Sequence, residues 1–288
     1  SVGDTMTSKD EHYWDNYPDK YNKTISADDI KLFIGRIMQY GYTGKVTTSW
    51  VSQNDEDADK IAHIMATQTL IWETVVGERD ADFNHVDIGD YDAVKDQVSK
   101  SHFLYDRYIA YYNSIEKSVK SHAKTPSFFD KSSSKAQDVE LAWNGKNYSA
   151  TLTDTNNVLS NYTFSANQSG ITFSVSGNKL TITASSAPSK KVSITATKNG
   201  STRKGIVVWS DGVYKPGSGQ QDLVTYSAEV NDPVKGYLNI KVSLGGVKIV
   251  KTSEDDKVSG ISFTITGNGV NKMVTTGANG EIKIDNLS

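Results

Sequence analysis

The sequence predicts an α+β protein: a helical subdomain packs on an antiparallel β-sandwich or barrel subdomain, and the first strands of an Ig-like β-sandwich follow. Three observations lead to this prediction. Helical periodicity dominates up to Pro126, and after Asp130 the composition shifts to Ser, Thr, Val, Asn and Gly while the hydrophobic period falls to two. A further set of strand patterns begins after Gly245 and Gly246. With 288 residues, 36% of them hydrophobic, the chain is long enough for two or three domains with their own cores.

Four segments of the first part have the spacing of amphipathic helices. The first begins with a capping box, Ser26 and Asp29, and ends at Gly41. The second carries acidic residues in its first turn and ends at Gly77. We therefore assign residues 1–128 to a helix-rich subdomain. The four predicted helices span residues 26–41, 55–77, 90–100 and 103–122.

The second part alternates apolar and polar residues, as half-buried strands do. Residues 176–179, Ser-Gly-Asn-Lys, have the composition of a hairpin loop. We assign residues 129–243 to a β-subdomain. Residues 244–288 are too few for the roughly seven strands of a complete sandwich, so they read as the first half of a further domain. Predicted strands lie within 138–143, 148–154, 171–184, 190–199, 204–210, 222–230, 236–243, 246–267 and 278–288.

Charge and hydropathy exclude two classes of partner. The net charge is -3 and basic residues are interspersed with acidic ones, so no basic stripe for nucleic acid is expected. No apolar run approaches the roughly 20 residues of a membrane span, and we expect no membrane contact in this segment. The first residues lack the pattern of a signal peptide, so an export signal or anchor is expected to lie outside the segment.

The chain contains no cysteine, which excludes disulfide bonds and thiolate metal sites. Its histidines show no ligand spacing such as His-Glu-x-x-His. We therefore predict no metal and no cofactor, and expect each histidine to be a surface or capping residue. The five histidines are His12, His63, His85, His102 and His122.

Gln68 interrupts an apolar stripe of the helix predicted over residues 55–77. The three-four spacing of the stripe runs through position 68, so the side chain is expected to point inward. A buried primary amide costs about 1–3 kcal/mol unless its donors and acceptor find partners. Gln68 is thus either a structural residue bonded to a strand backbone or one whose carbonyl carbon takes part in chemistry. The stripe consists of Ile61, Ile64, Met65, Ile71, Trp72 and Val75.

The segment from Thr67 to Trp72, Thr-Gln-Thr-Leu-Ile-Trp, resembles the Thr-Gln-x-x-apolar-Trp motif of thioester domains at the tips of Gram-positive pili and surface adhesins. The resemblance extends over roughly residues 1 to 242 and includes Gly-Glu-Arg-Asp at 77–80 and Gln-Gln-Asp-Leu-Val-Thr-Tyr at 220–226. In that family a helical subdomain is inserted into a β-subdomain, and a helix glutamine is joined to a strand cysteine. The resemblance implies that Gln68 is the thioester-forming residue, with Thr67, Ile71 and Trp72 completing the motif.

A thioester carbonyl is more electrophilic than an amide, and a buried one survives until a host nucleophile, such as an amine, is held beside it. The resemblance therefore implies single-use acylation of a host surface or extracellular-matrix protein rather than turnover. Trp72, four residues after Gln68, either shields and positions the glutamine or simply packs in the core. His63, five residues before it, lies on another face and is not expected to act as a base.

The absence of cysteine departs from the family, whose cysteine lies in an early strand within an aromatic-Cys-apolar triplet. Either the segment begins downstream of that strand or the cysteine is replaced. The turn-rich, polar stretch from Ser1 to Trp14 favours truncation. In both cases no internal thioester can form in this chain. Truncation also predicts exposed sheet edges that pair with another chain.

Lys251 is expected on an apolar strand face, because alternation places it with Val247 and Ile249. A buried ammonium is costly unless it is paired or neutralised. Residues 246–267 resemble the start of collagen-adhesin B-type stalk domains, in which a first-strand lysine forms an isopeptide with a late asparagine under a buried acid. This resemblance makes Lys251 the isopeptide candidate, with its partners expected past Ser288. The alternative is a strand-end lysine that reaches solvent.

Together the resemblances imply a fragment of a bacterial cell-surface adhesin or pilus tip, extracellular and anchored to the cell wall. The alternative is a non-covalent carbohydrate- or protein-binding module, indicated by the aromatic segments 11–21 and 105–112. A glycosidase-like enzyme would need paired acids such as Glu73 and Glu78. These are five residues apart and are expected to face different ways on a helix, so we expect no enzyme.

Overall fold

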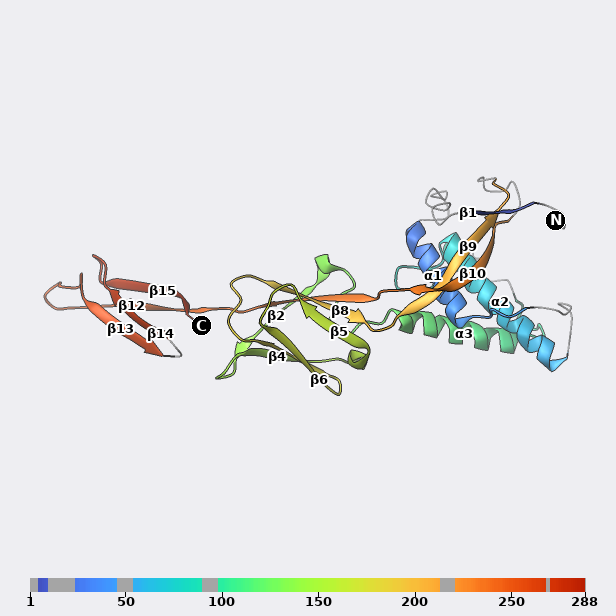
Figure 1. The fold of residues 1–288 in the computed structure, drawn as a ribbon. Helices are drawn as coiled ribbons and strands as arrows, with labels where there is room; N and C mark the ends of the chain where they lie inside the picture. Colours follow the sequence, from blue (N-terminus) through green and yellow to red (C-terminus); the bar gives the residue numbers. More distant parts are fainter. Residues whose placement is uncertain are drawn as a thin grey trace. The chain divides into compact units, whose positions relative to one another are not determined.

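The computed structural model describes residues 5–9, 24–45, 54–89, 98–212, 221–267 and 270–287. These residues confirm the predicted α+β class, since they form three α-helices and several mainly antiparallel sheets (Figure 1). Among the described strands a sandwich-like arrangement is present and no closed barrel, so the sandwich is the correct one of the two predicted forms. The chain divides into two compact units, Ser1–Lys124 with Gly200–Val234, and Thr125–Asn199 with Lys235–Ser288.

The first unit contains the three helices, close to their predicted bounds. Ser26 caps the first helix by accepting a hydrogen bond from the backbone N–H of Asp29. Gly77 ends the second with φ of 92°, a left-handed conformation that suits glycine. Most of the helix predicted over residues 90–100 lies outside the described residues. The helices are α1 (Ala27–Tyr40), α2 (Asp55–Val76) and α3 (Tyr105–His122).

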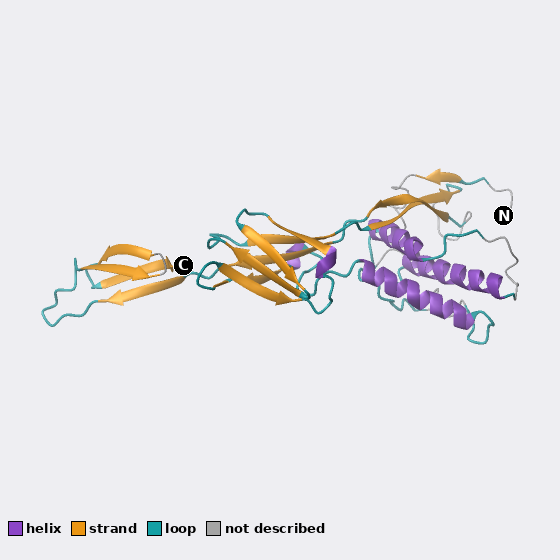
Figure 2. Ribbon diagram, turned by 60° about the horizontal axis from the view of Figure 1, so that its bottom comes forward, coloured by secondary structure: helices purple, strands orange, loops and turns teal. Residues whose placement is uncertain are grey.

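A small antiparallel sheet lies beside the helices of this unit (Figure 2). It has three strands, in the order β1-β9-β10. Helix α1 lies against β9 so closely that a Cβ on Gly35 would come within 2.4 Å of the backbone oxygen of Lys204. Ile206 and Val208 of β9 pack on the core of the three helices. The sheet comprises β1 (Thr7–Lys9), β9 (Thr202–Ser210) and β10 (Leu223–Asn231).

The packing of β9 and β10 differs from the grouping expected from sequence. The pattern placed them with residues 129–243, whereas in the structure they belong to the same compact unit as the helices. Strand alternation shows that one face of a strand is buried but not what buries it. The helical core supplies that cover here, because Val208 is buried among helix side chains.

The second unit contains a sandwich of two four-stranded sheets. Gly177, with φ of 58°, lies in the predicted hairpin loop between β6 and β7. β2 runs parallel to β11, and the other pairs are antiparallel. The first sheet is β2 (Gln137–Glu140), β11 (Lys235–Lys241), β8 (Val192–Lys198) and β5 (Tyr162–Ala166); the second is β3 (Ala142–Trp143), β4 (Tyr148–Thr153), β7 (Lys179–Ala184) and β6 (Ile171–Ser176).

Residues 245–267 and 270–287 contain two two-stranded antiparallel sheets. Ile282 and Ile284 of β15 are buried there. The Ig-like assignment of this segment stays a prediction. In the part of the chain that the structure describes, no helix has the length and apolar character to cross a membrane. The pairs are β12 (Gly245–Val250) with β15 (Glu281–Leu287), and β13 (Ser262–Gly267) with β14 (Val270–Thr275).

Candidate functional site

Gln68 lies on α2 at the edge of the buried face rather than in its centre. The most deeply buried apolar side chains of this helix are those of Ile61, Ala62, Ala66 and Leu70. Gln68 is partly exposed, like Ile64 and Trp72, which lie four residues before and after it. The expectation of a largely buried glutamine is therefore met only in part. The apolar stripe identified in the sequence contains residues of both the buried face and the half-exposed flank, because both are mostly apolar.

Thr67 holds the connection after α1 against α2, next to Gln68. Its hydroxyl donates to the backbone oxygen of His63 at 2.9 Å and accepts the backbone N–H of Tyr42, also at 2.9 Å. The backbone of Gly41 approaches so closely that a Cβ there would lie 2.7 Å from Thr67 Oγ1. The motif is thus divided: Thr67 and Ile71 are buried, while Gln68 and Trp72 share the partly exposed flank.

We expect Thr67→Val to lower the free energy of unfolding by about 1–3 kcal/mol, because the N–H of Tyr42 loses its acceptor while the side-chain shape is kept. Urea unfolding followed by helical circular dichroism measures this effect in the first unit, which contains all the described α-helices. Thr74→Val is the matched control, because the buried Thr74 hydroxyl donates only to the oxygen of Leu70 within the same helix. Equal losses in the two variants would contradict the assigned role of Thr67.

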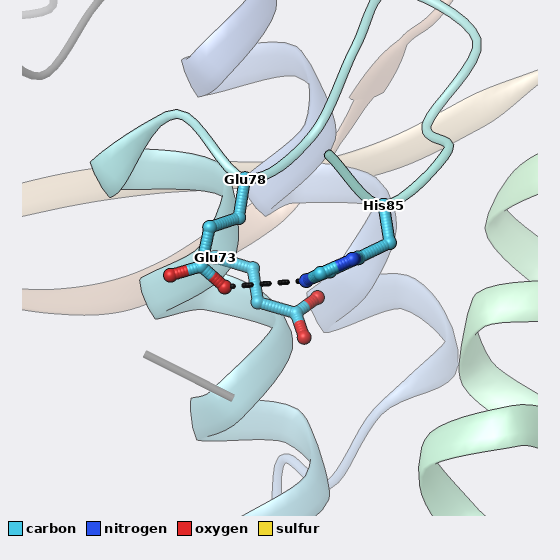
Figure 3. Close-up of side chains that lie close together, drawn as sticks. All are labelled: Glu73, Glu78 and His85. Carbon is cyan, nitrogen blue, oxygen red and sulfur yellow. Dashed lines mark ion pairs between the residues drawn. The ribbon is translucent and has the colours of Figure 1, made fainter. Parts of the chain in front are cut away.

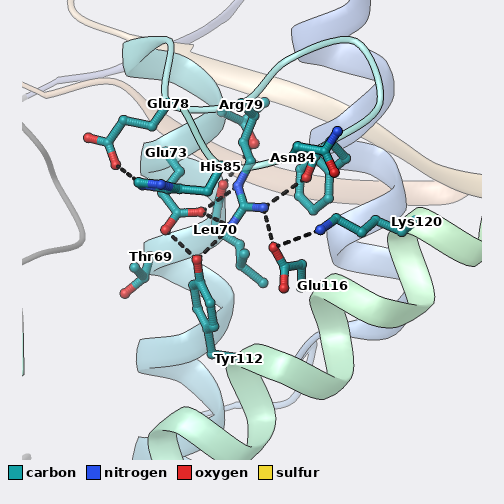
Figure 4. Close-up of polar contacts among 12 residues, drawn as sticks. Thr69, Leu70, Glu73, Glu78, Arg79, Asn84, His85, Tyr112, Glu116 and Lys120 are labelled. Atoms are coloured by element: carbon teal, nitrogen blue, oxygen red, sulfur yellow. Dashed lines mark hydrogen bonds and ion pairs between the residues drawn. The ribbon is translucent and has the colours of Figure 1, made fainter. Parts of the chain in front are cut away.

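A buried polar cluster lies at the C-terminal end of α2, centred on Arg79 (Figure 4). Its Nε donates to Glu73 Oε2 at 2.6 Å, and its Nη1 donates to Glu116 Oε1 at 2.5 Å and to the backbone oxygen of Phe83 at 2.8 Å. Tyr112 donates to Glu73 Oε1 at 2.7 Å and accepts from Arg79 Nη2. Every branch of the guanidinium is therefore engaged, which explains how Arg79 can be fully buried.

Burial sets the electrostatics of this cluster. It raises the pKa of Glu73, although Arg79 and Tyr112 oppose the shift. Burial and the neighbouring charge of Glu73 hold the pKa of Tyr112 well above its usual range, so its hydroxyl remains a donor. Burial also acts to raise the pKa of Glu116, but the hydrogen bonds and charges of Arg79 and Lys120 together outweigh it and the pKa is lowered.

Glu78 and His85 approach Glu73 from the turn that follows α2 (Figure 3). The backbone N–H of Val86 donates to the oxygen of Glu78 at 2.7 Å, and Arg79 forms an isolated bridge with His85. His85 Nε2 then lies 3.5 Å from Glu78 Oε2. Glu73 and Glu78 were expected to face different ways, and this expectation was wrong. The helix ends before Glu78, and the left-handed Gly77 turns the chain back.

A second buried ionic cluster joins α1, α3 and the residue after β10. Arg36 donates to both carboxylate oxygens of Asp232, at 2.7 and 3.0 Å. His122 Nε2 lies 2.7 Å from Asp232 Oδ2, and its Nδ1 lies 2.6 Å from the hydroxyl of Tyr40. Each histidine was expected to be a surface or capping residue, and for His122, only 4% exposed, the surface alternative was wrong. The sequence gives no signal for these ion pairs, because Asp232 lies 196 positions from Arg36 and 110 positions from His122.

The remaining candidates lie apart from these clusters. His63 stacks on Tyr111 with centroids 4.0 Å apart, and burial lowers the pKa of His63. Lys251 is partly exposed, and its Nζ donates to the backbone oxygen of Thr252 at 2.5 Å. Tyr108 and Tyr112 are buried and belong to the core. The aromatic segment 11–21 lies outside the described residues.

No protein-family model matches the chain, and no curated protein matches it. The structure is similar to the thioester domain of the Staphylococcus aureus TIE protein, with 22% identity and a TM-score of 0.35 over 84% of this chain and 77% of that one. It is also similar to the Bacillus anthracis TIE protein, with 17% identity and a TM-score of 0.35 over 88% of this chain and 46% of that one. The chain thus spans less than half of the latter.

Proposed function

We propose that this chain is a module of a Gram-positive surface adhesin or pilus tip, which acts outside the cell and binds a host surface or extracellular-matrix protein. The observation that carries the proposal is the Thr67-Gln68-x-x-Ile71-Trp72 motif on α2 and the way it is oriented. Thr67 binds the connection after α1 and Ile71 packs in the core, while Gln68 and Trp72 lie on the partly exposed flank. A ring beside an amide offers a partner both apolar area and hydrogen bonds.

Without cysteine the thioester route is closed within this chain, so Gln68 stays a primary amide. Contact through this flank is then non-covalent and involves no turnover. Tryptophan is enriched among the residues that dominate binding energy at protein interfaces. We therefore assign Trp72 the larger share of the contact and Gln68 a hydrogen-bonding share, and we propose that neither residue is catalytic.

The test is binding of the fluorescently labelled 288-residue chain to immobilised fibronectin, fibrinogen and collagen and to mammalian cells, before and after the surfaces are treated with trypsin. We expect reversible binding that trypsin treatment abolishes, and a loss of at least about tenfold in affinity for Trp72→Ala. Trp143→Ala, which removes an exposed tryptophan of the second unit, is the control and should bind as wild type. Absence of binding to every surface contradicts the proposal, and trypsin-resistant binding supports a carbohydrate partner instead.

The mass of the chain tests the covalent alternatives separately. Formation of a thioester at Gln68 or of an isopeptide at Lys251 with an asparagine would expel one ammonia. We expect the intact mass to equal that of the sequence, both before and after incubation with host proteins. A loss of one ammonia would show that a pair of side chains, such as Lys251 with an asparagine, had formed a cross-link.

A further inference from the structure

We propose that Glu73, Glu78 and His85 form a binding site for a divalent transition-metal ion, with Zn²⁺ as the reference ion. One ligand atom from each side chain lies within 4.8 Å of the other two (Figure 3). Carboxylates and an imidazole are ligands that Zn²⁺ takes in proteins, and three protein ligands leave one position open. The inference does not depend on the proposed adhesion.

The spacing between Glu78 and His85 fits two ligands of one ion. Oε2 of Glu78 and Nε2 of His85 are 3.5 Å apart, longer than a good hydrogen bond. Two ligand atoms that each lie about 2.0–2.2 Å from a tetrahedral ion are separated by about 3.3–3.6 Å. The observed separation therefore accommodates an ion between the two side chains with little movement of either.

The charges at this position favour a cation. Glu73 and Glu78 are both fully buried, and two buried carboxylates at this distance repel each other when ionised. Arg79 offsets Glu73, but it divides its hydrogen bonds between Glu73 and Glu116. A divalent ion between Glu73 and Glu78 removes the repulsion directly.

The surroundings orient the ligands and leave a path for the ion. Arg79 and Tyr112 fix the Glu73 carboxylate by hydrogen bonds of 2.6 and 2.7 Å, as outer partners of metal ligands commonly do. The side chain of His85 is 35% exposed, so the ion and a bound water can reach the site from solvent. A bound ion would tie the turn that carries Glu78 and His85 to the end of α2.

The experiment uses the full chain after treatment with a chelator and dialysis. Calorimetric titration with Zn²⁺ should give one ion per chain, and the midpoint of thermal unfolding of the helical signal should rise with Zn²⁺ and fall back with chelator. Tyr112→Phe should weaken binding by about 10–100-fold through the loss of its hydrogen bond to Glu73. His85→Ala removes a ligand without entering the core, so it should weaken binding by more than about 100-fold.

His102→Ala is the matched control, because His102 is exposed and lies outside this cluster. It should bind Zn²⁺ as wild type does. An unchanged circular dichroism spectrum of His85→Ala shows that a loss of binding is not a loss of fold. The proposal is overturned if no Zn²⁺ binds, which would leave Glu78 and His85 as an ion pair alone. Retention of the single strong site in His85→Ala, which indicates adventitious binding elsewhere, overturns it as well.

Discussion

Arg79→Met is expected to lower the free energy of unfolding of the helical unit by about 3–5 kcal/mol. Methionine retains most of the side-chain volume but none of the donors. Glu73 would then be left fully buried without its guanidinium partner, and the backbone oxygen of Phe83 would lose a donor. Removing one partner of a buried ion pair lowers the free energy of unfolding by far more than the intact pair contributes, because the remaining charge stays buried without compensation. Urea unfolding followed by helical circular dichroism measures the loss.

The matched control is Arg107→Met on α3. Arg107 donates to the backbone and side chain of Asp55, each at 2.8 Å, but both side chains are solvent-accessible. Exposed pairs contribute about 0–1 kcal/mol, so this variant should unfold nearly as wild type does. If Arg79→Met were as mild as Arg107→Met, the cluster at the end of α2 would not hold the helical unit together.

Helices were the most predictable part of the fold, because each carries its own boundary signals. The helix predicted over residues 26–41 spans Ala27–Tyr40, and the one predicted over 55–77 spans Asp55–Val76. Ser26 and Gly77 lie at the predicted ends. Local hydrogen bonds and backbone conformation decide these ends, and both depend on nearby residues. By contrast, the strand pattern at β9 could not show that a helical core covers it.

The contacts of the two buried clusters were unpredictable for a related reason. Glu73 and Glu78 come together only because the chain reverses at Gly77, and the return of His85 depends on its bridge to Arg79. Sequence spacing on an ideal helix gave the opposite expectation. The position of Gln68 was only partly predictable, since an apolar flank and an apolar core produce the same three-four spacing.

The second large effect is expected at Asp232, which joins α1 and α3 through Arg36 and His122. Asp232→Asn should lower the free energy of unfolding near neutral pH by about 3–5 kcal/mol, because Arg36 loses a two-point carboxylate partner in a buried setting. Glu229→Gln is the matched control, since Glu229 pairs with Lys204 at an exposed position and solvent screens that pair, so the variant should unfold nearly as wild type does.

The same substitution should alter the dependence of stability on pH. Burial acts to raise the pKa of Asp232, but His122 and Arg36 outweigh it and hold the pKa well below its usual range. A carboxyl whose pKa is lower in the folded state stabilises fully above its unfolded pKa of about 3.9, and this contribution is lost as the pH falls toward the folded pKa. The wild-type protein should therefore lose stability from about pH 5 downward. Asp232→Asn lacks this pH-dependent contribution, so the difference in free energy of unfolding between wild type and variant should narrow as the pH falls. A difference that stays constant between pH 7 and pH 3 would show that the pKa of Asp232 is not lowered in the folded state.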